Sequence, residues 1–172
     1  MRIIKHKKIV DPDAKPDLFS ILFTSCFYVG YIPKASGTFG SLFALLFLFI
    51  NGFQNPTVLL ISIIVCFIIG IYTSKVMMKK FGDDPSVVVI DEVVGMWITI
   101  LVFILLSMGN LSLFYMMVCF FCFRFFDIFK LQPAKYFDDR NTGYGVMMDD
   151  VIAGVYAGIT TYLISMTKFN PF

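Results

Sequence analysis

The sequence predicts an all-α, polytopic membrane protein, a bundle of about five spans preceded by an N-terminal interfacial or re-entrant helix. The first observation is composition, because 58% of the 172 residues are hydrophobic and only 15% are charged, against roughly 25% charged in soluble proteins. The second is the length of the apolar runs, several of which approach the about 20 residues that a membrane-spanning helix needs. Since every backbone hydrogen bond must close within a segment in lipid, helices are expected. A soluble enzyme is therefore disfavoured.

Five apolar stretches are the candidate spans: residues 40–53, 57–78, 87–108, 111–129 and 146–166. Each is too long for a typical strand. An earlier stretch, residues 18–32, carries three hydroxyl side chains, so we expect an interfacial or re-entrant helix there. The third span is expected to start at Asp84 and Pro85, because Asp is a good N-cap and proline suits the first helical position. Asp91 would then lie about 10 Å inside that helix.

The distribution of charge predicts the topology. Residues 1–17 are interpreted as a basic cytoplasmic tail and residues 18–172 as a single membrane-embedded domain. When the five spans are threaded, 13 of the 14 Lys and Arg lie on or near one side, and only Lys168 lies on the other. The positive-inside rule makes the first side cytoplasmic. The basic residues 1–8 are not followed by an apolar core, so no signal peptide is expected.

Several chemistries are disfavoured by residue type. The four cysteines lie inside apolar runs, where a free thiol behaves as a small hydrophobe, and no disulfide framework is expected. Cys119 and Cys122 have the spacing of a zinc or redox motif, but no second pair completes a site. The single histidine, His6, lies in the tail, which argues against a buried histidine nucleophile or base. A net charge of +2 is too small to favour nucleic acid as a partner.

Six ionisable residues lie within the apolar segments, where a charge at a helix centre costs about 2.5–3.5 kcal/mol. They are Asp91, Glu92, Arg124, Asp127, Asp149 and Asp150. Because the spans alternate in direction, all six are expected at one level near the cytoplasmic interface. With Lys34 and Lys130 added, five carboxylates and three basic groups leave two negative charges, which one divalent cation neutralises. Oxygen ligands without His or Cys suit Mg²⁺ or Mn²⁺, and Mg²⁺ commonly bridges carboxylates to a substrate phosphate.

The segment PKASGTFGS, residues 33–41, lies where the first span begins. Small residues let a backbone approach a ligand closely, and the free amides of a helix start attract anions. We therefore expect a phosphate cradle here, with candidate contacts Lys34, Ser36, Gly37, Thr38 and Ser41. Ser and Gly are also good helix starters, so a purely structural role stays open.

Structural roles are also open for other charged and small residues. Arg124 and Asp127 are three residues apart and would also suit a simple intrahelical ion pair. Gly95, Gly154 and Gly158 are interpreted as close-packing positions between helices. Solvated loop charges are expected at Asp83, Asp138, Asp139 and Arg140.

Four segments resemble the motifs of the phosphatidylglycerophosphatase A family, in the same order. They are PKASGTFGS, DPSVVVIDEVVGMW, FRFFDIFKLQPAKYFD and GVMMDDVIAGVYA, within residues 31–157. The resemblance implies a multi-pass enzyme of the bacterial inner membrane, with its site facing the cytoplasm. It also implies a Mg²⁺-dependent phosphatase that converts phosphatidylglycerophosphate in the bilayer to phosphatidylglycerol and phosphate.

The resemblance assigns roles to residues of this sequence. It implies metal-binding acidic positions at Asp91, Glu92, Asp127, Asp149 and Asp150. Of these, we expect catalytic roles for Asp91, Glu92, Asp127 and Asp150. The implied phosphate contacts are Lys34, Ser36, Gly37, Thr38, Arg124 and Lys130. Either a water molecule attacks the phosphorus or an aspartyl-phosphate forms, and both routes stay open.

Two other classes of protein share some of these sequence features. A CDP-alcohol phosphatidyltransferase is also a small helical membrane enzyme with interfacial aspartates, but its signature has Ala-Arg where this chain has Ala153 and Gly154. An ion- or proton-coupled transporter usually places ionisable groups near the middle of the membrane. Here the central turns of the candidate spans carry none, which favours the phosphatase.

Overall fold

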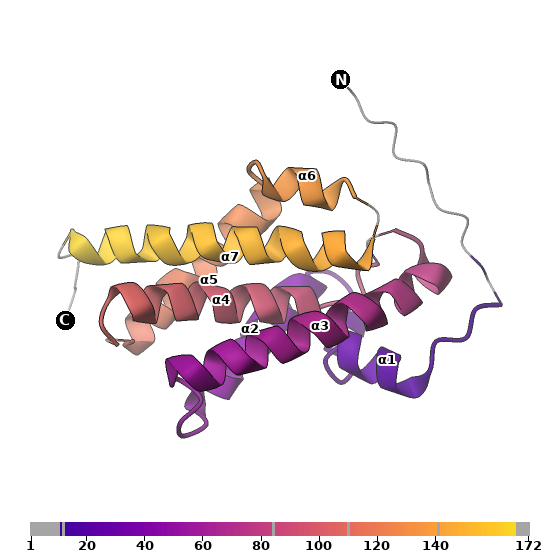
Figure 1. Ribbon diagram of the computed structural model, residues 1–172, viewed down its shortest axis with the longest axis horizontal. Coiled ribbons are helices and arrows are strands. Elements are labelled where there is room, and N and C mark those ends of the chain that lie inside the picture. Colours follow the sequence, from indigo (N-terminus) through magenta and orange to yellow (C-terminus); the bar gives the residue numbers. More distant parts are fainter. Residues whose placement is uncertain (1–10, 12, 84, 110, 141, 168–172) are drawn as a thin grey trace.

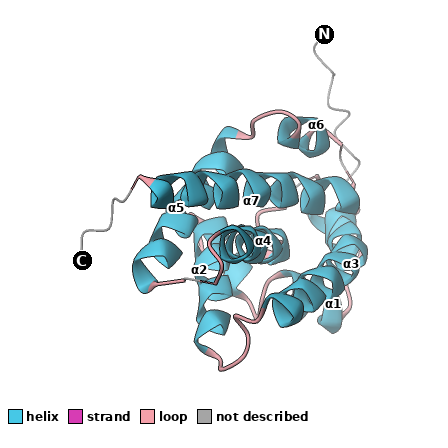
Figure 2. Cartoon of the chain, turned by 60° about the vertical axis from the view of Figure 1, so that its left-hand side comes forward, coloured by secondary structure: helices cyan, strands magenta, loops and turns pink. Residues whose placement is uncertain are grey.

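Figure 1 shows the computed structural model, which describes residues 11, 13–83, 85–109, 111–140 and 142–167. Within this part of the chain every regular element is a helix, and no strand is present (Figure 2). The α-helices are α1 (Leu18–Thr24), α2 (Ser36–Leu46), α3 (Pro56–Phe81), α4 (Ile90–Leu106), α5 (Leu113–Phe129), α6 (Ala134–Asp138) and α7 (Gly143–Met166). Two 3-10 helices are η1 (Val29–Tyr31) and η2 (Phe47–Phe49). The all-α prediction is confirmed.

Helix α4 lies at the centre of the bundle. Figure 2 shows it nearly end-on, with α7 above it, α5 and α2 to the left, and α3 and α1 to the right. Thirteen of its 17 residues are buried, as expected for a helix that is apolar on every face. The indole Nε1 of Trp97 donates a hydrogen bond to the carbonyl oxygen of Ala44, at 3.0 Å, and so fastens α4 to α2.

Glycines hold the backbones of α4 and α7 in direct contact. A Cβ atom at Gly154 would lie 2.4 Å from the carbonyl oxygen of Gly95, and one at Gly158 would lie 2.8 Å from that of Thr99. A Cβ at Gly95 would in turn lie 2.8 Å from the carbonyl oxygen of Asp150. The residue numbers of the contacting pairs increase together along α4 and α7, so the two helices run parallel. The close-packing interpretation of these glycines is confirmed.

Residues 18–32 do not form one continuous helix. The seven residues of α1 extend about 10 Å, far less than the about 30 Å of a bilayer's hydrocarbon core. Positive φ angles at residues 26–28 then turn the chain into η1. The carbonyl oxygen of Thr24 accepts a hydrogen bond from the amide of Val89, at 2.8 Å, so the turn is tied to the start of α4.

The predicted start of the third long apolar helix is wrong. Helix α4 begins at Ile90, and Pro85 lies in a turn ahead of it, while Asp84 lies outside the described residues. The backbone amide of Val89, just before α4, donates a hydrogen bond to the carbonyl oxygen of Thr24 in α1. This hydrogen bond holds residues 85–89 as a turn. In consequence Asp91 and Glu92 lie in the first turn of α4 rather than about 10 Å inside it.

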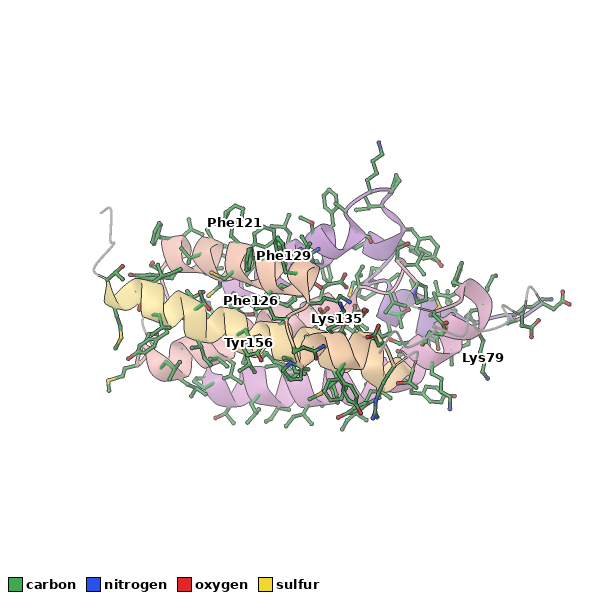
Figure 3. All side chains as sticks on the ribbon, turned by 90° about the horizontal axis from the view of Figure 1, so that it is seen from above. Lys79, Phe121, Phe126, Phe129, Lys135 and Tyr156 are labelled. Atoms are coloured by element: carbon green, nitrogen blue, oxygen red, sulfur yellow. The ribbon has the colours of Figure 1, made fainter. Side chains whose placement is uncertain are left out.

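The outer surface of the bundle is strongly apolar. Only seven of the 26 residues of α3 are buried, and its outward face exposes isoleucine, leucine and valine side chains. Phe121 and Phe129 of α5, each 64% exposed, point away from the bundle (Figure 3). Among the described residues α3 alone is long and apolar enough to cross a membrane by length and composition. The count of five spans therefore stays a prediction.

Replacing Gly154 with alanine tests the α4–α7 contact. We expect Gly154→Ala to lower the melting temperature of the purified protein in detergent, because the added Cβ overlaps a backbone oxygen and overpacking costs about 1–3 kcal/mol. The matched control is Val155→Ile, which adds one methyl group on the exposed side of the same helix. Circular dichroism during heating measures both. Equal melting temperatures for the two variants would contradict the contact.

Candidate active site

Four helices meet at a polar pocket of about 330 Å³. The start of α2, the first turn of α4, the last turns of α5 and a point two turns into α7 all face it. The pocket contains all five predicted carboxylates: Asp91, Glu92, Asp127, Asp149 and Asp150. Four predicted phosphate contacts also line it: Ser36, Gly37, Arg124 and Lys130.

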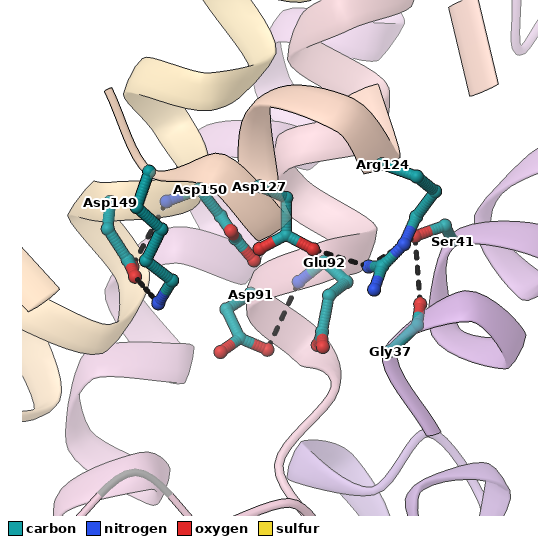
Figure 4. A network of polar contacts seen from close by, with 9 residues as sticks. Gly37, Ser41, Asp91, Glu92, Arg124, Asp127, Asp149 and Asp150 are labelled. Carbon is teal, nitrogen blue, oxygen red and sulfur yellow. Dashed lines mark hydrogen bonds and ion pairs between the residues drawn. The ribbon is translucent and has the colours of Figure 1, made fainter. Parts of the chain in front are cut away.

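Three of the carboxylates form one tight group (Figure 4). Asp91 and Glu92 from α4 and Asp150 from α7 each place one oxygen within 4.8 Å of the others. Asp91 and Asp150 are only 7% and 4% exposed. The Oε2 atom of Glu92 is buried and lacks a hydrogen-bond partner among the described residues. Because carboxylates at this separation repel each other, the group is suited to a bound cation.

The fourth carboxylate, Asp127, is bound to Arg124 on the same helix. Its Oδ2 lies 2.6 Å from the Nη1 atom of Arg124, which confirms the expected ion pair. The same Nη1 donates to the hydroxyl of Ser41 at 3.4 Å. Ser41 in turn donates to the carbonyl oxygen of Gly37 at 2.8 Å and is fully buried. Ser41 therefore does not line the pocket but orients the side chain of Arg124 through this hydrogen bond.

The fifth carboxylate, Asp149, is bound to Lys130. The Nζ atom of Lys130 lies 2.7 Å from Asp149 and 2.7 Å from Asp138. Burial of the ammonium group favours its neutral form, but the two carboxylates outweigh this and raise the pKa of Lys130 above its ordinary value. The lysine therefore stays charged. The expectation that Asp138 is a solvated loop charge is wrong, because α6 places it against this ammonium group.

Gly37 brings the start of α2 onto the carboxylate group. A Cβ atom at this position would lie 2.2 Å from Oε1 of Glu92 and 3.0 Å from Nη1 of Arg124. No side chain caps α2, whose preceding residue Ala35 has a φ of 58°. The first amides of the helix thus have no partner within it, and they carry the partial positive charge of a helix start.

Besides Ser41, two other predicted contacts lie outside the pocket, and two residues of the site were missed. Lys34 is exposed on the loop before α2, and neither it nor Thr38 lines the pocket. Ser86 lines it and was overlooked, although it belongs to the second quoted motif. Asp138 was missed because only the return of α6 over α7 brings it to Lys130.

A larger hollow of about 800 Å³ lies at the opposite end of the bundle, between the ends of α4 and α7 and the start of α5. Among the residues that the structure describes, its lining contains no carboxylate, lysine or arginine. The smaller pocket is therefore the candidate active site.

Carboxylates that converge beside an arginine, a lysine and an uncapped helix start are suited in charge to a phosphate ester and a cation. The site thus belongs to the class of enzymes that act on phosphate esters. A family model of phosphatidylglycerophosphatase A matches residues 22–165. The chain belongs to that family and is a phosphatase, a hydrolase of phosphoric monoesters.

Curated relatives agree over most of the chain. Phosphatidylglycerophosphatase A of Haemophilus influenzae is 36% identical over 138 residues, covering 78% of this chain and 82% of the relative. The Escherichia coli protein of the same name is 31% identical over 163 residues, covering 93% and 91%. A Bacteroides thetaiotaomicron protein with the provisional name phosphatidylinositol-3-phosphatase is 35% identical over 150 residues, covering 84% and 92%. No solved structure matches the chain.

Replacing Lys130 with methionine tests its ion pairs. We expect Lys130→Met to lower the melting temperature, because loss of the cation leaves two partly buried carboxylates uncompensated, at a cost of about 3 kcal/mol. Lys130→Arg should restore most of the stability. Lys135→Met, which removes an exposed lysine from α6 (Figure 3), is the control and should have little effect. A Lys130→Met variant as stable as this control would contradict the assignment.

Proposed function

We propose that the protein hydrolyses phosphatidylglycerophosphate to phosphatidylglycerol and phosphate, with Mg²⁺ bound in the pocket, at the cytoplasmic face of a bacterial inner membrane. The observation that carries the proposal is the group of Asp91, Glu92 and Asp150, with oxygens within 4.8 Å, beside Arg124 and Lys130 in one pocket. Membership of the family and the names of two relatives support this substrate.

The residues present fit a magnesium ion. Mg²⁺ prefers oxygen ligands, and Asp91, Glu92 and Asp150 would hold it, because one oxygen from each lies within 4.8 Å of the others. The buried Oε2 of Glu92, which lacks a hydrogen-bond partner among the described residues, is available as a ligand atom. Asp127 and Asp149 form ion pairs with Arg124 and Lys130, so we assign them the role of orienting these two basic side chains. When bound, Mg²⁺ polarises phosphoryl oxygens and lowers the pKa of a water ligand.

The basic groups are arranged to hold the phosphate. Asp127 and Ser41 orient the guanidinium of Arg124, whose buried Nε has no hydrogen-bond partner among the described residues. Lys130 adds a second positive charge, fixed by its two carboxylate partners. The uncapped amides at the start of α2 add donors next to Gly37. Together these groups hold the phosphate's oxygens in one orientation.

Hydrolysis then needs a water and a base. The water oxygen forms a bond to phosphorus while the bond from phosphorus to the glycerol oxygen breaks in line with it. Asp91 or Asp150 accepts the proton that the water loses, since both carboxylates face the pocket. The departing glycerol oxygen takes up a proton, and the products are phosphatidylglycerol and phosphate.

The apolar surface supports placement in a membrane. We assign the five spans to α2 with η2, α3, α4, α5 and α7, whose outward faces expose large hydrophobic side chains. The pocket lies at the end of the bundle where α2, α4 and α7 begin and α5 ends. The basic residues gather on this side, and the positive-inside rule makes it cytoplasmic.

Both rival classes are disfavoured by the packing. A phosphatidyltransferase signature would require arginine at position 154, where the backbone of Gly95 leaves no room even for a Cβ atom. A transporter would need ionisable groups along a path through the membrane. In the described parts of α4, α5 and α7 the charged residues lie only toward the pocket end.

Phosphate release from phosphatidylglycerophosphate in mixed micelles tests the reaction. We expect release with Mg²⁺ and none with EDTA. Asp91→Asn and Asp150→Asn should each lower kcat/KM by about two orders of magnitude, because metal stabilisation of the transition state is worth several kcal/mol. Asp13→Asn, which changes an exposed acid far from the pocket, should match the wild type.

Phosphatidylinositol 3-phosphate is the comparison substrate, because one relative is named for it. We expect it to be hydrolysed much more slowly. Faster release from it than from phosphatidylglycerophosphate would reassign the substrate. Full activity in EDTA would instead refute the proposed dependence of hydrolysis on Mg²⁺.

Labelling of introduced cysteines tests the topology. We expect Lys135→Cys on α6 to be protected from a membrane-impermeant maleimide in intact cells and labelled after lysis. Asn51→Cys, in the loop before α3, should be labelled in intact cells because the spans place it on the outer side. The reverse pattern would invert the orientation, and labelling of both residues in intact cells would contradict the membrane assignment.

A further inference from the structure

An apolar groove of about 490 Å³ runs between α2 and α5. Its size lies within the about 300–1,000 Å³ typical of ligand sites. Within the described part of the chain the lining contains no charged side chain. Its walls include Phe39, Leu42 and Leu46 of α2 and Leu113, Met116 and Met117 of α5. Several of these side chains are exposed, so the groove is open to the surroundings along its length.

The groove begins about one helical turn from the polar pocket. Both helices that form the groove, α2 and α5, also contribute residues to the pocket. Ser36 lines the pocket and Phe39, three residues later, lines the groove, so both lie on one face of α2. Met117 and Arg124 of α5 are seven residues apart and also share a face. The hydrogen bond from Arg124 to Ser41, at 3.4 Å, joins the two helices where groove and pocket meet.

The length of the groove matches one leaflet of a bilayer. Residues 39–49, from α2 into η2, supply its long wall. Ten helical steps extend about 15 Å, which is half of the about 30 Å hydrocarbon core. A chain whose head lies in the polar pocket would therefore follow this wall to about the middle of the bilayer.

We propose that the groove binds an acyl chain of the same lipid molecule whose phosphate occupies the pocket. This inference rests on the function proposed above. A chain held between α2 and α5 fixes the glycerol backbone relative to Arg124 and the carboxylate group, so the phosphate ester is presented in one orientation. The contribution is one of positioning, because an acyl chain gains little from moving out of an already apolar micelle or bilayer.

Filling the groove tests the proposal. Met117→Trp places a bulky ring in the groove from a residue that is 41% exposed. Ile64→Trp on the outer face of α3, at a residue 48% exposed, is the matched control. Each variant and the wild type are assayed in one detergent with dipalmitoyl and dibutyryl phosphatidylglycerophosphate. We expect Met117→Trp to lower kcat/KM about tenfold for the palmitoyl substrate and to leave the butyryl substrate within about twofold.

The outcomes separate this inference from the proposed function. Wild-type protein that hydrolyses neither substrate refutes the function itself. Wild-type protein that hydrolyses both, with a Met117→Trp variant of unchanged chain-length preference, refutes the groove alone. The same unchanged preference together with a shift from dimer to monomer in size-exclusion chromatography would assign the groove to a second copy of the chain.

Crosslinking of the unmodified protein gives a measurement that does not depend on a variant folding. A phosphatidylglycerophosphate analogue with a photoreactive group at the end of one acyl chain should label residues 42–49 and 113–117, and excess unlabelled substrate should suppress this labelling. Labelling that is spread over the outer face of α3 and does not compete with substrate would overturn the proposal.

Discussion

The backbone contact between α4 and α7 is the constraint on which the site depends. Asp91 precedes Gly95 by four residues, and Asp150 precedes Gly154 by four, so each acid lies one turn from its glycine on the same helix face. Because the two helices run parallel and touch at these glycines, the carboxylates of the adjoining turn come within reach of one ion. Any larger residue at the contact would move the helices apart and the carboxylates with them.

Around this contact the charges are divided between two tasks. Three carboxylates, on Asp91, Glu92 and Asp150, remain together as the candidate cation site. The other two carboxylates form ion pairs instead, Asp127 with Arg124 and Asp149 with Lys130. The carboxylate group and the two basic side chains therefore lie side by side, an arrangement that suits the proposed phosphate ester and metal ion. Gly37 allows the uncapped start of α2 to close over both.

The polar and apolar parts of the molecule are arranged along the same helices. Ser36 and Arg124 face the pocket, and the continuation of α2 and α5 forms the groove and much of the apolar outer surface. A lipid bound in this way presents its phosphate to the carboxylate group while its hydrocarbon stays beside apolar side chains. Catalysis at the membrane surface then needs no extraction of the substrate from the bilayer.

Much of this protein was predictable from sequence because the responsible signals are local. Long apolar runs predict the helices, and acidic residues at matching levels within those runs predict a carboxylate cluster, whatever the details of packing. The start of α4 was mispredicted because a hydrogen bond to α1, distant in sequence, holds residues 85–89 as a turn.

Tertiary structure alone decided which charged residues form ion pairs with each other and which remain to bind a ligand. Nothing in the spacing of Asp138 shows that α6 returns to place it against Lys130, or that Lys34 and Thr38 fall outside the pocket. Sequence thus determined which residue types gather at one end of the bundle. The packing of α2, α6 and α7 decided which of them bind each other and which remain to bind a ligand, because partner choice depends on distances that only the folded chain sets.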